Sequence, residues 1–137
     1  MALRVLSIML GVFLLFMGLD KISWFLDGSI LANRLQEWRA MARPLARWYI
    51  DTIALPGVPM FARIVPLAEL AAGSALILGF WTRLAAVMAL LMVINIHLAA
   101  DVMLRFDYLI NAYGLPVLGG LLALAIGAKK LPYSLSK

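Results

Sequence analysis

Residues 66–101, PLAELAAGSALILGFWTRLAAVMALLMVINIHLAAD, are the stretch that decides the fold. They form two apolar segments joined by a very short turn at residues 80–83. Glu69 lies inside the first segment, and His97 lies inside the second, with Asp101 one helical turn further along. Apolar runs of this length with so few charges are typical of helices that cross a membrane. The stretch therefore predicts a hairpin of two membrane-spanning helices.

The composition of the whole chain indicates the same class of protein. Of its 137 residues, 65% are hydrophobic and 14% are charged, and the mean hydropathy is +0.99. A soluble domain has about 25% charged residues. At about 20 residues per span, four helices and their connectors use the whole chain, so we expect one membrane domain over residues 1–137. No small-residue cleavage site follows the first apolar run, so we expect a retained span rather than a secretory signal.

The residue types that are scarce exclude several kinds of chemistry. The chain has no cysteine and one histidine. Disulfides, thiol redox relays, iron–sulfur clusters and multi-histidine metal or haem sites therefore cannot be built from this chain alone. We expect no intrinsic cofactor, no metal site and no nucleic-acid partner. The net charge of +5 resides mainly in connectors and in the tail, where anionic lipid head groups or an acidic partner surface are the simpler counterparts.

The pattern of apolar runs predicts an all-α integral membrane protein, an antiparallel bundle of four transmembrane helices with both termini on one side. The expected spans cover residues of about 3–26, 61–80, 82–103 and 108–128. Within the first span, Gly11 and Gly18 lie two turns apart on one face, where small residues allow another helix to approach closely.

The connector between the first two expected spans is the longest and has a pattern of its own. Apolar residues recur at helical spacing, and arginines fill the other face: Arg34, Arg39, Arg43 and Arg47. This pattern predicts an amphipathic helix over about residues 30–53 that lies in the membrane interface and is broken or kinked at Pro44. The four arginines are candidates for docking an acidic partner surface.

Polar side chains within the expected spans gather at one depth. Counted at about 1.5 Å of rise per residue, they fall in the half of the bilayer beneath the long connector: Lys21, Glu69, Asn95, His97 and Asp101. The half nearest the termini is expected to be almost purely apolar. Ionisable groups at membrane depth usually face the bundle interior and pair with one another, so these residues are candidates for the wall of a binding pocket.

The same residues also have a purely structural interpretation. Lys21 and Glu69 can form an ion pair that locks the first span to the second. His97 and Asp101 lie four residues apart on one expected helix face, so a hydrogen bond between them is feasible. His97 could instead donate to a neighbouring helix without doing chemistry. The pocket and the structural lock both remain open at this point.

Two groups of residues resemble the DoxX family. The first span carries a matching pattern at Arg4, Gly11, Gly18 and Lys21, and residues 66–86 carry a second at Pro66, Glu69, Gly73, Leu78-Gly79 and Thr82-Arg83-Leu84-Ala85-Ala86. A polar segment at residues 95–99 resembles the one that follows in the family. The resemblance covers about residues 3–104. It implies a four-helix protein of the bacterial cytoplasmic membrane, with relatives that include the small subunit of thiosulfate:quinone oxidoreductase and membrane components of redox-defence complexes. Lys21, Glu69, Arg83 and His97 are the positions carried over.

Three functions are compatible with these observations. The one that we favour is an accessory subunit, not catalytic alone, that packs against other membrane subunits of a redox or electron-transfer complex and contacts membrane lipids. The alternative is a quinone-binding redox subunit in which Lys21 or His97 binds a carbonyl oxygen and Glu69 or Asp101 handles protons. A lipid, or a pigment owned by a partner, is a further possible ligand. A small transporter or channel is a minor alternative, because polar groups in one leaflet do not form a through path.

Overall fold

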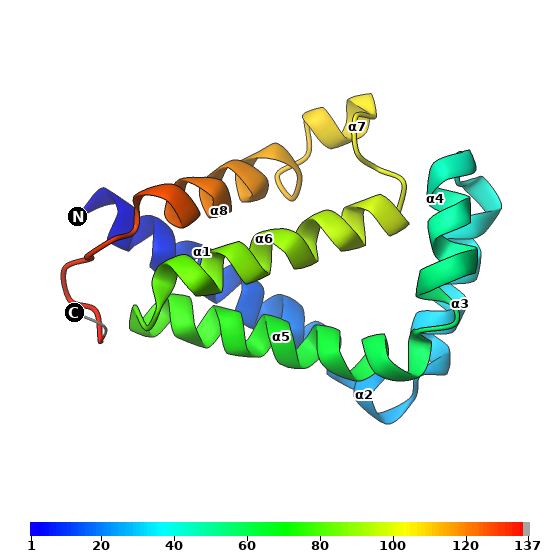
Figure 1. Cartoon of the computed structure of the whole chain (residues 1–137), viewed down its shortest axis with the longest axis horizontal. Coiled ribbons are helices and arrows are strands. Elements are labelled where there is room, and N and C mark those ends of the chain that lie inside the picture. Colours follow the sequence, from blue (N-terminus) through cyan, green and yellow to red (C-terminus); the bar gives the residue numbers. More distant parts are fainter. Residues whose placement is uncertain (136–137) are drawn as a thin grey trace.

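The protein is described by a computed structural model that covers residues 1–135, in which every regular element is a helix. In chain order these are α1 (Ala2–Asp20), α2 (Ile22–Leu26), α3 (Ser29–Met41), α4 (Pro44–Tyr49), the π-helical turn η1 (Ile50–Ala54), α5 (Val58–Leu78), α6 (Thr82–Ala99), α7 (Phe106–Leu109) and α8 (Leu115–Gly127). Figure 1 shows α1, α5, α6 and α8 side by side, with α3 and α4 across one end.

Three of these helices are long and apolar enough to cross a membrane. They are α1, α5 and α6, with 19, 21 and 18 residues and mean hydropathies of 2.3, 1.6 and 1.8 over their most apolar windows. Large apolar side chains such as Phe16 and Met88 point outward from them, with 64% and 58% of their surface exposed. This outward apolar surface suits lipid contact. The fourth apolar helix, α8, has 13 residues.

The four apolar helices enclose a common core. Helix α1 contacts α5 and α8, and α6 contacts the same two helices. Fully buried leucines from three helices meet at the centre: Leu14, Leu76, Leu121 and Leu124. Small residues of α6, such as Ala86 and Ala89, let it lie close to them. This packing holds the ends of the helices in a fixed arrangement.

Glycines let α1 and α5 approach each other closely. A Cβ added to Gly73 would lie 2.7 Å from the Leu15 nitrogen and 2.8 Å from the Gly11 oxygen, and one added to Gly18 would lie 2.9 Å from the Leu70 side chain. Backbone atoms leave no room for these additions. The prediction that Gly11 and Gly18 allow a close helix approach is confirmed, with Gly73 as the matching residue on α5.

The long connector consists of two helices and a π-helical turn, with a break close to Pro44 where a break or kink was predicted. Helix α3 ends at Met41, and Ala42 and Arg43 are extended before Pro44 begins α4. Proline disfavours a helical conformation at the residue before it and suits the first turn of a helix, so the break falls before Pro44 rather than at it. Apolar residues beneath α3 and α4 form a second core: Leu31, Leu35, Ala46, Tyr49 and Ile50.

All four expected spans have different ends in the structure, and the second is shifted to Val58–Leu78 from residues 61–80. The first breaks at Lys21, where α2 begins, and the third ends at Ala99 rather than at residue 103. The fourth apolar helix begins at Leu115 rather than at residue 108. Here the Asn111 side chain accepts a hydrogen bond from the Tyr113 backbone at 2.7 Å, which turns the chain before α8.

The end of the molecule nearest the termini is less apolar than expected. Arg4 and Ser7 are buried there. Both side chains donate to the Leu76 carbonyl, at 3.0 and 2.7 Å, and Arg4 also donates to the Ile77 carbonyl at 2.6 Å. These carbonyls belong to the last turn of α5, which lacks backbone partners and favours a cation. Arg4 therefore has a structural task at the C-terminus of α5.

Candidate functional site

Lys21 and Glu69 form a buried ion pair between α1 and α5. The Lys21 ammonium donates to both carboxylate oxygens of Glu69 at 3.0 Å, and the two side chains are only 9% and 3% exposed. Lys21 lies at the break between α1 and α2, and Glu69 lies in the middle of α5. Two of the three ammonium donors are thus used by Glu69, and the carbonyl of Met17 lies 3.4 Å from the nitrogen.

This ion pair lines a cavity of about 410 Å³, here called the inner cavity. Residues from α1, α2, α3, α5, α6, α8 and the segments before α2 and α8 surround it. They combine charged, aromatic and aliphatic side chains, among them Phe13, Met17, Asp20, Lys21, Trp24, Arg34, Trp38, Glu69, Val93, Ile96, His97, Tyr113 and Val117. Such a mixture of an apolar wall with a few polar groups is typical of small-molecule sites. The inner cavity is the candidate functional site.

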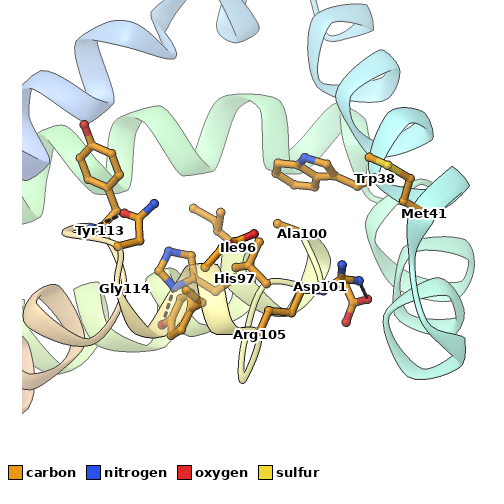
Figure 2. Close-up of a pocket in the computed structure, with 13 residues that line it drawn as sticks. Trp38, Met41, Ile96, His97, Ala100, Asp101, Arg105, Tyr113 and Gly114 are labelled. Carbon is orange, nitrogen blue, oxygen red and sulfur yellow. Dashed lines mark hydrogen bonds and ion pairs between the residues drawn. The ribbon is translucent and has the colours of Figure 1, made fainter.

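A second cavity of about 530 Å³, the outer cavity, lies between α3 and the segment before α8. In Figure 2, Trp38 and Met41 of α3 lie on one side of it, Tyr113 and Gly114 lie on the other, and His97 lies between them. Polar groups of residues 101–111 complete its lining: Asp101, Arg105, Asp107, Tyr108 and Asn111. Trp38, Ile96, His97 and Tyr113 line both cavities.

His97 bonds to Tyr108 and not to Asp101. Its Nδ1 lies 3.0 Å from the Tyr108 hydroxyl, and the two rings meet edge to face with centroids 5.2 Å apart. The hydrogen bond between His97 and Asp101 that the spacing made feasible does not form, because α6 ends at Ala99 and Asp101 adopts a left-handed backbone conformation with φ of 53°. That change of direction takes Asp101 off the helix face that carries His97.

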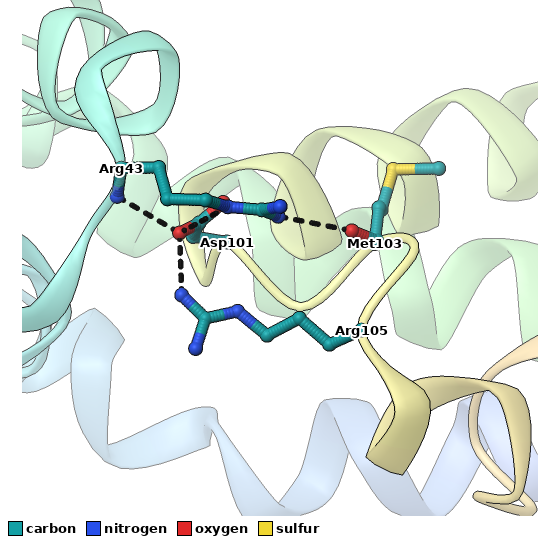
Figure 3. Close-up of polar contacts among 4 residues, drawn as sticks. All are labelled: Arg43, Asp101, Met103 and Arg105. Carbon is teal, nitrogen blue, oxygen red and sulfur yellow. Dashed lines mark hydrogen bonds and ion pairs between the residues drawn. The ribbon is translucent and has the colours of Figure 1, made fainter.

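Asp101 instead joins the connector between α3 and α4 to the end of α6, as Figure 3 shows. Its carboxylate accepts from the Arg43 backbone at 2.9 Å, from Arg43 Nε at 3.0 Å, and from Arg105 at 2.7 Å. These bonds, above all the one from the Arg43 side chain, hold the pKa of the Asp101 carboxyl well below its usual range, although burial acts in the opposite direction. Asp101 therefore remains an anion that fastens α3 and α4 over the bundle.

This fastening predicts a specific pH dependence. Because the folded-state pKa of Asp101 is depressed, its contacts stabilise the fold fully above the unfolded-state pKa of about 3.9 and are lost as the pH falls through the lower folded-state value. Amide exchange at Ala42 and Arg43, corrected for intrinsic rates, should be constant from about pH 8 to about pH 5 and rise below about pH 4. Asp101→Asn should raise it about tenfold at neutral pH, whereas unchanged exchange would contradict the fastening.

The predicted site residues divide into two groups. Lys21, Glu69 and His97 meet at the inner cavity. Asn95 does not line it: its side-chain oxygen accepts a hydrogen bond from the Tyr49 hydroxyl, beneath the second core. Asp101 lines the outer cavity only. Three of the five predicted site residues therefore lie at one cavity.

Several residues that shape the site were not among the candidates. Trp24 and Trp38 line the inner cavity, Tyr108 holds His97, and Arg105 binds Asp101. Trp24 follows the charged end of the first expected span, and Trp38 is one of the apolar residues that recur at helical spacing in the long connector. The position of Tyr108 depends on the turns after α6, and no pattern in the sequence indicates them.

Three of the four arginines predicted to dock a partner have carboxylate partners within residues 1–135. Arg43 binds Asp101. Arg39 bonds to Asp51 at 2.5 Å, and Arg34 lies 3.9 Å from Glu37. The Arg39 and Arg34 pairs are exposed on both sides, so each contributes little stability. They reduce the positive charge that α3 and α4 present.

Long apolar helices, an outward apolar surface and a buried ion pair at one end define an integral membrane protein. A family model, DoxX, matches residues 2–101, which is most of the chain, and the chain belongs to the DoxX family. The ion pair and His97 lie inside the matched region, whereas the part of the outer wall that includes Arg105, Tyr108 and Tyr113 lies beyond it. Searches of curated proteins and of solved structures found no match.

Proposed function

We propose that this protein is the membrane subunit of a redox complex of the bacterial cytoplasmic membrane and that it binds a quinone head group in the inner cavity. The observation that carries the proposal is the lining of the inner cavity, which combines Lys21, His97 and the indoles of Trp24 and Trp38. Its volume of about 410 Å³ falls within the range of small-molecule sites, roughly 300–1,000 Å³.

The chemistry of the wall suits a quinone. A quinone head group is a flat, mostly apolar ring with two carbonyl acceptors. Trp24 and Trp38 offer flat apolar surfaces. The Lys21 ammonium makes its third hydrogen bond to the Met17 carbonyl at 3.4 Å, a long contact that a ligand carbonyl oxygen would replace. His97 has Nε2 available for a ligand while Nδ1 bonds to Tyr108. Donors and ring surfaces therefore occur in the same cavity.

The chain needs a partner for electron transfer. With no cysteine and a single histidine, it supplies no redox centre of its own, so electrons would pass between the quinone and a partner subunit. In this arrangement α8 with its preceding connector completes a four-span bundle, and α3 and α4 lie in the interface plane. The arginines of α3 and α4, with Arg47 among them, face an acidic surface of the partner.

Binding can be measured with a short-chain quinone analogue titrated into the full chain in nanodiscs. Tryptophan fluorescence should be quenched saturably, because Trp24 and Trp38 line the cavity. Lys21→Met combined with Glu69→Leu removes both charges while filling the space, and should weaken binding about tenfold or more. Trp81→Phe, at the opposite end of α6, should leave the affinity unchanged. Non-saturable quenching, or equal affinity in the double variant, would refute the proposal.

An accessory subunit without a ligand is the second candidate, and a specific observation favours it. Lys21 and Glu69 bind each other through both carboxylate oxygens, which is what a lock between α1 and α5 requires. Native gels of gently solubilised protein, with mass spectrometry and quinone extraction, separate the two functions. A stoichiometric complex that carries no quinone at this subunit supports the accessory role, and quinone that copurifies with wild type but not with the double variant supports the binding role.

A further inference from the structure

His97 lies in the wall between the inner and the outer cavity and is hydrogen-bonded on the outer side. We propose that His97 and Tyr108 form a proton relay that connects the outer cavity with a head group in the inner cavity. This inference rests on the proposed function, because it assigns the path by which protons reach that ligand. It adds to the binding site Tyr108, which lines the outer cavity and not the inner one.

The geometry of the pair suits a relay. The imidazole of His97 lines both cavities, while Tyr108 lines the outer one. Their Nδ1 and hydroxyl are 3.0 Å apart, which is hydrogen-bond distance. Tyr108 is fixed in place: it is 6% exposed, and its carbonyl lies so close to Gly114 that an added Cβ there would approach within 2.5 Å. The hydroxyl therefore has little freedom to leave the imidazole.

The outer cavity can supply the protons. Its volume of about 530 Å³ holds several waters at about 30 Å³ each. Polar groups face it from the segment after α6: Asp101, Arg105 and Asp107. Asp101 is held by Arg43 and Arg105, so it is committed to structure. In the wall of the outer cavity, the hydroxyl that lies within hydrogen-bond distance of His97 is that of Tyr108.

On the inner side, other titratable groups are less suited to exchange protons with water. Lys21 and Glu69 hold each other in a buried pair. Asp20 and Arg34 also line the inner cavity, and neither contributes to the wall of the outer one. Within residues 1–135, two titratable side chains line both cavities, His97 and Tyr113. Of these two, His97 is the one that bonds to Tyr108.

The relay moves protons and no electrons. Water in the outer cavity gives a proton to the Tyr108 oxygen as the Tyr108 proton passes to His97 Nδ1. The imidazole releases its Nε2 proton to the ligand oxygen in the inner cavity, and tautomer exchange then restores the ring. Each proton that arrives is balanced by one that leaves, and the reverse sequence serves a ligand that loses protons.

The single histidine of the chain makes the test direct. The full chain, labelled with ¹⁵N-histidine and placed in nanodiscs, gives one imidazole whose proton exchange with water can be measured by NMR without any ligand. Tyr108→Phe removes only the hydroxyl and should slow this exchange about tenfold or more, because Nδ1 loses the hydrogen-bonded hydroxyl that passes protons between it and water. Tyr113→Phe makes the same change in a residue that lines both cavities and should leave the exchange rate unchanged.

The outcomes separate the relay from the proposed function. Equal exchange in wild type and Tyr108→Phe, or equal slowing by Tyr113→Phe, would overturn the relay. Saturable quinone binding without Tyr108-dependent exchange leaves the binding site and removes the relay. Tyr108-dependent exchange without quinone binding supports the proton path and overturns the proposed ligand. Circular dichroism and the elution volume of each variant check that it has folded.

Discussion

Glu69→Gln is expected to lower the free energy of unfolding by about 3–5 kcal/mol, because it leaves the Lys21 ammonium buried without its counter-charge. The two side chains are 3% and 9% exposed and 3.0 Å apart, so neither charge has solvent to replace its partner. Unfolding by dodecyl sulfate in mixed micelles, followed by circular dichroism, measures the effect. The change adds or removes no heavy atom, so a large loss must come from charge and hydrogen bonding.

Removing both charges together is expected to restore most of that stability. Lys21→Met with Glu69→Leu replaces a buried ion pair by apolar side chains of similar volume, which is often neutral or stabilising. If the double variant is as unstable as Glu69→Gln, the pair contributes more than mutual neutralisation. A double variant that folds but does not bind quinone separates the binding role of the pair from its structural role.

Gly73→Ala is expected to cost about 1–3 kcal/mol, the usual range for forcing extra volume into a tight contact. The new methyl would lie 2.7 Å from the Leu15 nitrogen and 2.8 Å from the Gly11 oxygen. Both are backbone atoms, so α1 and α5 must separate as rigid bodies. The ion pair further along the same two helices should then lengthen. The same unfolding measurement in mixed micelles provides the comparison.

Gly119→Ala is the matched control for this prediction. Gly119 lies in α8, and an added Cβ there would meet nothing within 4 Å. Alanine is the better helix former, so this variant should be unchanged or more stable by up to about 1 kcal/mol. Equal losses in Gly73→Ala and Gly119→Ala would show that helix packing is not the cause.

The sequence predicted those parts of the fold that depend on hydropathy and depth. The hairpin of α5 and α6 follows from two apolar runs with a turn too short for anything else. Lys21 and Glu69 could be placed at one depth by counting residues along straight helices. The same counting brought His97 to their level. Because the rise per residue of a helix is nearly constant, the depth of a residue in the membrane is what the sequence predicts best.

What the sequence did not predict depends on single backbone turns. The left-handed conformation of Asp101 takes its side chain off the helix face that carries His97. The turn at Asn111 places the start of α8 at Leu115. Short loops of this kind are decided by tertiary contacts, here the bonds from Arg43 and Arg105 to one carboxylate. The contact between Tyr108 and His97 therefore depends on backbone turns that no periodic pattern in the sequence indicates.

The shortness of α8 has a consequence for the surrounding bilayer. Its 13 residues give about 20 Å of helix, against a hydrocarbon core of about 30 Å, whereas α1 and α5 nearly match that thickness. The side of the protein formed by α8 therefore has a hydrophobic mismatch with the bilayer. Either the bilayer becomes thinner there, or the connector after α6 covers the remaining hydrocarbon thickness. Exposed backbone is tolerated at that depth only beside water or protein. A neighbouring helix packed against the α8 face would remove this mismatch, because it would replace the thinned lipid.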